Sequence, residues 1–455
     1  MNFSLEKLKR KIMDSLIAWR ESNAIDRKAL VIRGLRQVGK TFIVREFAKR
    51  YYRHEIYINF KNRTDVKSIF ENNFDIDRIM FDLSALMPNI RFSPNDTVLI
   101  FDEIQECANA RASLKAFIED GRYDVIATGS LLGISGYNQK IGKGVPTGFE
   151  HFVYMRPLDF EEFLWAKGVS EQVVDGLKKS FQTKTPISRA VHDQMLRYFR
   201  EYICVGGMPS VVNTYLSTGN LGRVFAKQSD LIQEYRDDFG KHLDLDENEQ
   251  VNRLLLARIN EVFDSIPSQL AKENKKFQYS KISGKGKNSD YREAIQWLVD
   301  AGIVTQCFNL SNLEAPLEGN KVNDVFKLYL TDTGLLMAML GKNFGGDILN
   351  GKSLGVCTGP IFENAIADVF LKLERKLYYF RKDSGLEVDF VIEHERETAL
   401  VEVKARSGHA KSSSTILSNY PRYKVRKCIK FSESNIGEID GIFSVPYYLA
   451  FLLEE

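Results

Sequence analysis

The sequence has few cysteines and no long hydrophobic segment. Five cysteines are scattered through 455 residues, and no two of them form a Cys-x-x-Cys pair. This pattern argues against a disulfide framework and against a zinc site, and it is typical of a reducing compartment. Because no run of about 18 apolar residues occurs, we expect no transmembrane helix and no membrane partner. The first residues lack a cationic start followed by an apolar core, so we expect a cytoplasmic protein without a secretory signal.

The chain also lacks a strong excess of charge of either sign. Its 63 basic and 60 acidic side chains give a formal net charge of +3, so any nucleic-acid surface must be a local patch. Hydrophobic residues make up 44% and charged residues 27%, proportions that are typical of a folded globular chain. At about 150 residues per domain, the length predicts roughly three domains.

The N-terminal segment has the pattern of an amphipathic helix. Leu5, Leu8, Ile12 and Leu16 recur at helical spacing, with lysine and arginine between them. We assign residues 1–19 to a helix that docks on the next domain rather than to an element of a membrane surface.

Residues 20–165 have the pattern of an α/β domain. Short, continuous apolar runs alternate here with helical patterns. Strands that are apolar on both faces predict a parallel sheet covered by helices on both sides. The four runs comprise residues 29–32, 56–60, 98–101 and 125–128.

The rest of the chain divides into three predicted regions. Residues 166–250 are mostly helical in pattern and are assigned to a helical lid. Residues 251–345 contain helices followed by two strands, 303–310 and 325–330, and this order predicts a winged helix. Residues 346–455 return to an α/β pattern and form the last predicted domain.

A complete phosphate-loop motif follows the first predicted strand. Glycines let the backbone curl, so that its N–H groups surround a phosphate at the positive end of the following helix. We expect Lys40 to reach the β- and γ-phosphates of a nucleoside triphosphate and the Thr41 hydroxyl to bind Mg²⁺. The motif, known as Walker A, comprises Gly34, Leu35, Arg36, Gln37, Val38, Gly39, Lys40 and Thr41.

Polar side chains follow two more of the predicted buried strands. Asp102 and Glu103 come directly after residues 98–101, at the end of the strand where ligands bind in open α/β sheets. We expect Asp102 to hold Mg²⁺ and Glu103 to orient and deprotonate the attacking water, which favours hydrolysis over binding alone. Thr128 and Ser130 end the next strand, where their hydroxyls are expected to bond the γ-phosphate or the water. The alternative for Ser130 is the N-cap of a helix.

Five motifs together resemble a family of bacterial and archaeal AAA-type ATPases that carry a C-terminal domain of unknown function. They are the phosphate loop, Asp102-Glu103-Ile104-Gln105, Thr128-Gly129-Ser130, Arg156-Pro157-Leu158-Asp159-Phe160-Glu161-Glu162-Phe163 and Gly206-Gly207-Met208-Pro209. The resemblance implies ATP as the nucleotide. It also implies an α/β fold: a P-loop NTPase parallel sheet with a helical lid, a winged helix and a C-terminal α/β nuclease-like domain. Many relatives carry Gly-Arg where this chain has Gly148-Phe149, so Arg156 and Arg236 are the remaining candidates for an arginine that senses the γ-phosphate.

The C-terminal region contains a second set of candidate site residues. Period-two alternation places Asp389 opposite the apolar face of one strand, and places Glu402 and Lys404 on one face of another. With Glu363 on an upstream helix, this order resembles the core of PD-(D/E)xK nucleases. The resemblance implies Mg²⁺ at Glu363, Asp389 and Glu402, with Lys404 acting on the attacking water. The alternative is a surface strand with a Glu–Lys pair in a catalytically inert fold.

A basic segment precedes and enters the helix predicted at residues 291–301. A winged helix would direct this segment at the major groove of DNA, with its lysines on the phosphates. The alternative is a solvated, lysine-rich loop. The segment contains Lys272, Lys275, Lys276, Lys281, Lys285, Lys287 and Arg292, with Tyr279 and Tyr291 between them.

These observations favour a Mg²⁺-dependent ATPase whose nucleotide state drives DNA-directed winged-helix and nuclease-like domains. An alternative is a slow, nucleotide-gated switch that binds a protein or DNA partner and carries an inert nuclease-like domain. A third hypothesis adds endonuclease activity at Asp389 and Lys404. The sequence leaves the target, the cellular pathway and the oligomeric state open.

Overall fold

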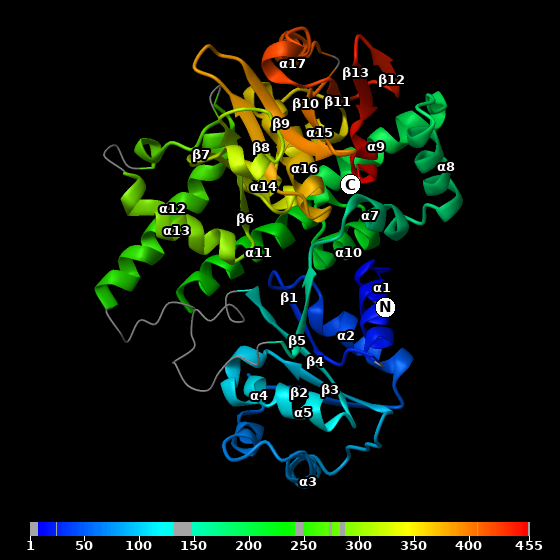
Figure 1. The fold of residues 1–455 in the computed structure, drawn as a ribbon, viewed down its shortest axis with the longest axis vertical. Coiled ribbons are helices and arrows are strands. Elements are labelled where there is room, and N and C mark those ends of the chain that lie inside the picture. The colour runs from blue at the N-terminus through cyan, green and yellow to red at the C-terminus, as the bar shows by residue number, and fades with distance from the viewer. Residues whose placement is uncertain are drawn as a thin grey trace.

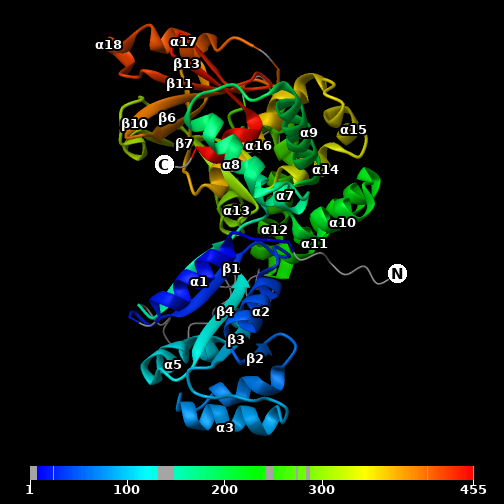
Figure 2. The ribbon, with the colours of Figure 1, turned by 90° about the vertical axis from the view of Figure 1, so that its right-hand side faces the viewer.

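The computed structural model shows two sheet-containing halves joined by a bundle of helices (Figure 1). In the view turned by 90°, α3 lies at one end of the molecule and α17 lies at the other (Figure 2). In the part of the chain that is described, no helix combines the length and the apolar character needed to cross a membrane. The described residues are 8–23, 25–131, 148–241, 249–272, 275–282, 287–406 and 408–453.

The N-terminal helix α1 (Ile12–Ser22) packs on the first sheet domain. Leu16 and Trp19 are buried, and the Trp19 ring lies 6.4 Å from the ring of Phe47 in α2 (Lys40–Tyr51). Leu5 of the predicted helix lies outside the described residues.

The first sheet is a five-stranded parallel sheet in the order β2-β3-β4-β1-β5. Alternate side chains of β1 enter two separate cores, one on each face, which is why residues 29–32 of this strand are all apolar. The prediction of a parallel α/β sheet is therefore confirmed. The strands are β1 (Ala29–Gly34), β2 (His54–Asn59), β3 (Thr97–Asp102), β4 (Asp124–Ser130) and β5 (Glu150–Met155), and the covering helices after α2 are η1 (Thr64–Phe70), α3 (Ile76–Leu86), η2 (Ile104–Glu106), α4 (Ala108–Ala112) and α5 (Leu114–Asp120).

Strand β5 was missing from the sequence prediction. It pairs with β1 at the sheet edge, and His151 and Phe152 are exposed, so it lacks the continuous apolar run of a central strand.

A series of helices follows the first sheet, in the region predicted to be helical. Asp159 and Glu162 form a capping box at the start of α7, which fixes where this series begins. The helices are α7 (Phe160–Ala166), α8 (Glu171–Gln182), α9 (Arg189–Val205), α10 (Pro209–Thr218) and α11 (Leu221–Lys241).

The second sheet has eight strands in the order β12-β13-β11-β10-β9-β8-β6-β7. Its strands are β6 (Val304–Leu310), β7 (Lys321–Leu330), β8 (Leu377–Arg381), β9 (Glu387–His394), β10 (Glu397–Val403), β11 (Lys427–Ser432), β12 (Gly437–Ile439) and β13 (Ile442–Pro446). The surrounding helices are α12 (Glu249–Leu270), η3 (Tyr279–Lys281), α13 (Asn288–Asp300), η4 (Leu317–Asn320), α14 (Thr333–Leu340), α15 (Phe344–Leu349), η5 (Gly355–Cys357), α16 (Thr358–Lys372), α17 (Lys411–Leu417), α18 (Tyr420–Tyr423) and η6 (Tyr447–Leu452).

The hairpin predicted as a wing belongs to this second sheet. Strands β6 and β7 pair antiparallel, and β6 also pairs in parallel with β8 of the C-terminal region. The sheet therefore crosses the predicted division at residue 345, because the free edge of the hairpin is covered by a strand that comes later in the chain. A free wing does not occur in the described residues, and the winged helix stays a prediction.

Lys372 links the two halves at the end of α16. Its ammonium donates to the carbonyl oxygen of Leu158 at 3.0 Å, to the Tyr202 hydroxyl at 2.6 Å and to the Asp368 carboxylate at 2.9 Å. Burial raises the pKa of Asp368 to about 7, although Lys372 opposes that shift. A continuous hydrophobic core also joins the first sheet to the second, so the halves are packed against each other and not merely tethered.

Candidate functional site

The phosphate loop connects β1 to α2 at the carboxyl edge of the first sheet. A methyl group at Gly34 would lie 2.2 Å from the carbonyl oxygen of Met155, so only glycine fits there. Gly39 has a φ of 98°, in the left-handed region that favours glycine. The two glycines thus account for the tight curl of the loop before α2, the form that presents backbone N–H groups to an anion.

Lys40 is buried and its ammonium is held by the loop itself. The Nζ atom donates to the carbonyl oxygens of Gly34 at 3.0 Å and Leu35 at 2.9 Å. Burial lowers the pKa of Lys40 to about 8, and the nearby charges of Glu103 and Asp102 only partly oppose this. Phosphate oxygens would accept stronger, charge-assisted bonds from this ammonium than the two carbonyls do.

Asp102 ends β3 and receives hydrogen bonds from four neutral side chains. The Thr41 hydroxyl lies 3.1 Å from Oδ1, the Tyr57 hydroxyl donates at 2.6 Å, and the Asn59 amide donates at 3.0 Å. The Thr128 hydroxyl also donates to Oδ1. The structure therefore brings together the predicted Thr41, Asp102 and Thr128, which come from α2 and two neighbouring strands.

The oxygen atoms of Thr41 and Asp102 are suitable ligands for a magnesium ion. Thr41 and Asp102 offer hydroxyl and carboxylate oxygens, the hard ligands that Mg²⁺ prefers. Tyr57 and Asn59 were missed by sequence reasoning. Asn59 nevertheless stands at the carboxyl end of a predicted strand, and such ends meet at one edge of a parallel sheet, so its position carried a usable signal.

Glu103 and Ser130 flank the phosphate loop from two strand ends. Glu103 has a φ of 54°, and its Oε2 atom accepts a hydrogen bond of 2.5 Å from the Gln105 amide. Gln105 therefore fixes where the Glu103 carboxylate points. Ser130 pairs in register with Gly34, which places it beside the first residue of the loop.

The C-terminal candidates Asp389, Glu402 and Lys404 lie together on β9, β10 and the residue after β10. Lys404 Nζ is 2.6 Å from Glu402 Oε2 and 3.7 Å from Asp389 Oδ2. Asp389 accepts from the Val403 backbone N–H at 2.9 Å, and the Ser413 hydroxyl donates to Glu402 at 2.8 Å. Burial, together with the charge of Glu363, raises the pKa of Asp389 to about 6.

Glu363 of α16 is neutralised by two lysines. It pairs with Lys275 and, at 3.1 Å, with Lys327, and it accepts a hydrogen bond from the Tyr329 hydroxyl. Lys327 also pairs with Glu387 at 3.0 Å. Burial opposes ionisation of Glu363, but the two lysines hold its pKa at about 2.

The cluster does not have the arrangement of a metal shell. Across the described ranges, no group of three or more histidine, cysteine, aspartate or glutamate side chains is placed to hold a metal ion. The Mg²⁺ role predicted for Glu363, Asp389 and Glu402 stays a prediction that this arrangement does not support.

The predicted basic segment is partly used inside the protein. Lys275 pairs with Glu363, Lys272 donates to Gln269 at 3.0 Å, and Tyr291 donates to Glu261 at 2.7 Å. Lys285 lies outside the described residues.

Comparison with known proteins covers most of the chain in three parts. An AAA domain family matches residues 26–164. This part of the chain is an AAA-type P-loop domain. Two domains of unknown function, DUF8612 and DUF4143, match residues 196–344 and 358–448. The AAA-type match covers both strand ends and the phosphate loop described above.

Three of the similar proteins found come from archaea and have low sequence identity to this chain. An uncharacterized protein of Methanocaldococcus jannaschii, MJ1544, is 27% identical over 389 residues, which is 82% of this chain and 74% of the relative. The Walker-type ATPase PABY2304 of Pyrococcus abyssi has 13% identity and a TM-score of 0.42, covering 74% of this chain and 97% of its own. The ORC2 protein of Aeropyrum pernix has 12% identity and a TM-score of 0.40, covering 76% and 93%. These values are too low to extend the function of either solved structure to this chain.

Helix α11 packs closely on the phosphate loop of the AAA-type domain. Arg36 of the loop pairs with Asp238, and the Tyr235 hydroxyl donates to the Arg36 carbonyl oxygen at 3.3 Å. The cavity left between the loop, α11 and Trp297 of α13 is about 30 Å³, which is room for about one or two water molecules. Arg36 therefore connects the phosphate loop directly to α11.

The Gly206-Gly207-Met208-Pro209 turn also joins the AAA-type domain to the C-terminal half. The Gly207 N–H donates to Asp332 at 2.6 Å, while its carbonyl oxygen accepts from the Leu158 N–H at 2.8 Å. A methyl group at Gly206 or Gly207 would lie 2.2 Å from an oxygen of Asp332 or of Leu158, respectively. This close fit explains why the motif needs both glycines.

Neither of the two arginines predicted to sense the γ-phosphate has a side-chain interaction with the described residues of the phosphate loop. Arg156 lies over the Tyr154 ring at 4.3 Å, and Arg236 pairs with Asp264. Sequence reasoning missed Arg10, which donates to the Val38 carbonyl oxygen at 3.3 Å and pairs with Glu162 at 3.1 Å.

Proposed function

We propose that the AAA-type domain binds ATP with Mg²⁺ and hydrolyses it. The observation that carries this proposal is the hydrogen bond between Thr41 and Asp102, 3.1 Å long, beside the buried ammonium of Lys40. Loop N–H groups and Lys40 bind the β- and γ-phosphates, and Thr41 with Asp102 holds the metal. Bound Mg²⁺ neutralises charge that develops on the transferred phosphoryl group.

Glu103 is the proposed base for the attacking water. Its carboxylate is oriented by Gln105 and is close enough to Lys40 to raise that lysine's pKa against the effect of burial. Ser130, beside Gly34, is proposed to bond the γ-phosphate or the water. Thr128 acts through Asp102, because its hydroxyl donates to that carboxylate.

Substitution of Glu103 tests this assignment. Glu103→Gln should lower ATP turnover about 100-fold or more while leaving ATP bound, since a positioned base contributes on this scale. Glu106→Gln is the matched control, because Glu106 is exposed in the 3-10 turn that follows. Steady-state turnover and ATP binding are measured on all three proteins. Unchanged turnover in Glu103→Gln would remove this residue from the mechanism.

The nucleotide state is proposed to move the helices and the second sheet. Arg36 and Asp238 connect the loop to α11, and Gly207 connects Leu158, which follows β5, to Asp332 at the start of α14. The output is proposed to be a nucleotide-gated change in the C-terminal half, which binds a DNA or protein partner. Two lysines on Glu363 favour a catalytically inert nuclease-like domain.

DNA-directed action and cleavage form the second candidate function. Asp389, Glu402 and Lys404 lie together, and Lys281 and Arg292 of the basic segment are exposed. Mg²⁺-dependent nicking of plasmid DNA, compared between the natural chain and Asp389→Ala, tests it. We expect no nicking that depends on Asp389. ATP turnover that rises many-fold with DNA, and nicking lost in Asp389→Ala, would favour the second candidate.

A further inference from the structure

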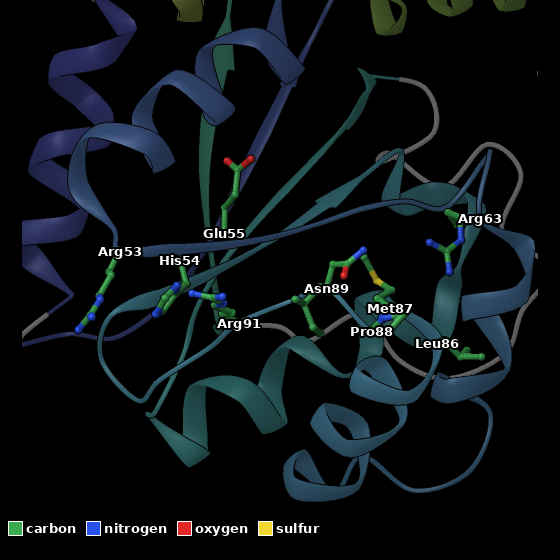
Figure 3. A pocket seen from close by; sticks show the side chains of 10 residues that line it. Arg53, His54, Glu55, Arg63, Leu86, Met87, Pro88, Asn89 and Arg91 are labelled. Carbon is green, nitrogen blue, oxygen red and sulfur yellow. The ribbon is translucent and has the colours of Figure 1, made fainter.

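A groove of about 520 Å³ lies beside β2, which is the edge strand opposite β5 in the first sheet. One wall is formed by the start of β2 and the other by residues 86–91, which follow α3 and run alongside the strand (Figure 3). The groove has the size of cavities that bind ligands. No residue of the proposed ATP site lines it.

One end of the groove carries uncompensated positive charge. Arg53, His54 and Arg91 are grouped there, whereas Glu55 points away from them (Figure 3) and pairs with Arg45 at 2.9 Å. Within the described ranges, the guanidinium groups of Arg53 and Arg91 have no hydrogen-bond or ion-pair partner. Guanidinium groups bind carboxylate and phosphate oxygens in a bidentate manner, so this end selects an oxyanion.

The other end of the groove holds apolar side chains together with Arg63, whose charge is paired with Asp65 at 2.7 Å (Figure 3). Leu86 is 44% exposed and lies with Met87 and Pro88 along the wall. An occupant that fits both ends carries negative charge and apolar groups along one extended chain.

The strand that borders the groove is a sheet edge. In the described sheet β2 pairs only with β3, so its outer backbone N–H and C=O groups have no strand partner. Edge strands of this kind bind extended peptides by adding a strand, with main-chain bonds for affinity and side-chain contacts for specificity.

We propose that this groove binds an extended acidic peptide segment of a partner protein. Carboxylates of the segment pair with Arg53 and Arg91, its apolar side chains contact Leu86 and Met87, and its backbone adds to β2. A single-stranded nucleic acid fits less well, because His54 is the only aromatic residue among those that line the groove and bases need aromatic platforms for stacking. The proposal does not depend on nucleotide binding.

Peptide binding to the full chain tests the proposal. The probe is a short fluorescent peptide that alternates glutamate with leucine, and the comparison peptide has glutamine in place of glutamate. Fluorescence anisotropy should show binding of the first peptide and at least about 10-fold weaker binding of the second. The double variant Arg53→Glu/Arg91→Glu should lose binding by a similar factor. Arg189→Glu is the matched control, since its side chain is 95% exposed on α9, and it should bind as the natural chain does.

Three further measurements separate the parts of the proposal. Peptide methylated on alternate backbone nitrogens should bind more weakly, and unchanged binding would overturn strand addition to β2. A thymidine oligonucleotide that displaces the peptide at lower concentration would overturn the peptide in favour of nucleic acid. Lys40→Ala should bind the peptide normally, which keeps this result separate from the ATP site. Equal binding of both peptides, or no binding of either, would overturn the proposal itself.

Discussion

Two buried lysines, one in each half of the molecule, differ in the groups that surround their ammonium and therefore in pKa. Lys40 of the phosphate loop is 9% exposed and contacts carbonyl oxygens, whereas Lys327 of the second sheet is 1% exposed and contacts Glu363 and Glu387. Burial by itself disfavours the charged form of both ammonium groups and so acts to lower both pKa values. It prevails at Lys40, with a pKa of about 8, but the carboxylates hold the pKa of Lys327 above its ordinary value.

The carboxylates of the two regions also differ in whether their partners are neutral or positively charged. Asp102 receives hydrogen bonds from hydroxyl and amide groups, which stabilise the carboxylate without bringing a positive charge into contact with it. Glu363 is surrounded by Lys275 and Lys327. A carboxylate held by neutral donors can still attract Mg²⁺, while one held by two ammonium groups has its counter-ions in place. The same residue types thus form the proposed Mg²⁺ site at one end and an internal salt bridge at the other.

The largest expected effect comes from removing the buried charge at Lys327. Lys327→Met leaves Glu363 and Glu387 without this partner, so the free energy of unfolding should fall by about 3–5 kcal/mol. The matched control is Lys376→Met, because Lys376 pairs with Glu318 at the surface with 73% of its side chain exposed. That change should cost at most about 1 kcal/mol. Thermal and urea unfolding measure both.

A double substitution sharpens this prediction. Lys327→Met with Glu363→Gln removes both charges of the pair and should recover part of the lost stability, since an absent pair costs less than a broken one. Equal losses in Lys327→Met and Lys376→Met would show that the internal salt bridge does not stabilise the second sheet.

At the other end, the expected effect concerns the metal and not the fold. Asp102→Asn keeps a side chain that can accept the Thr41 hydrogen bond but removes the charge. Mg²⁺-dependent ATP turnover should therefore fall about 100-fold, while the melting temperature changes little. Asp120→Asn, on a surface carboxylate that pairs with Arg122, is the control for turnover. If Asp102→Asn keeps full turnover at low Mg²⁺, the metal is held elsewhere.

The first sheet and its phosphate loop could be predicted because their signals are local. Gly34 to Thr41 are consecutive, and the runs that became β1, β3 and β4 place apolar side chains on both faces of the sheet. Strand β5 was missed because an exposed edge lacks that signal. Thr41, Asp102 and Thr128 could be placed together because strand ends share an edge in a parallel sheet.

The partners that decide the chemistry could not be predicted, because they come from distant parts of the chain. Lys275 and Lys327 reach Glu363 from different elements, and Asp238 reaches Arg36 across about half the chain. Alternation shows which face of a strand a side chain occupies, but it does not show which strand lies beside it. For the same reason, the order of helices and strands predicts a winged helix around β6 and β7, but the pairing of β6 with β8 could not be predicted.

The smallest expected effect is the pH dependence of ATP binding at Lys40. Phosphate binding needs the ammonium form, and the pKa of Lys40 is about 8, so affinity should be constant below that pH and fall above it. The fall should approach about 10-fold per pH unit, because one proton must be taken up for each ATP bound. Calorimetry between about pH 7 and about pH 9.5 at fixed Mg²⁺ measures it. Lys40→Arg should bind with a flat profile, since a guanidinium keeps its proton over this range. A flat profile in the natural chain would mean that the pKa of Lys40 is not lowered, and that the two buried lysines do not differ in the way described above.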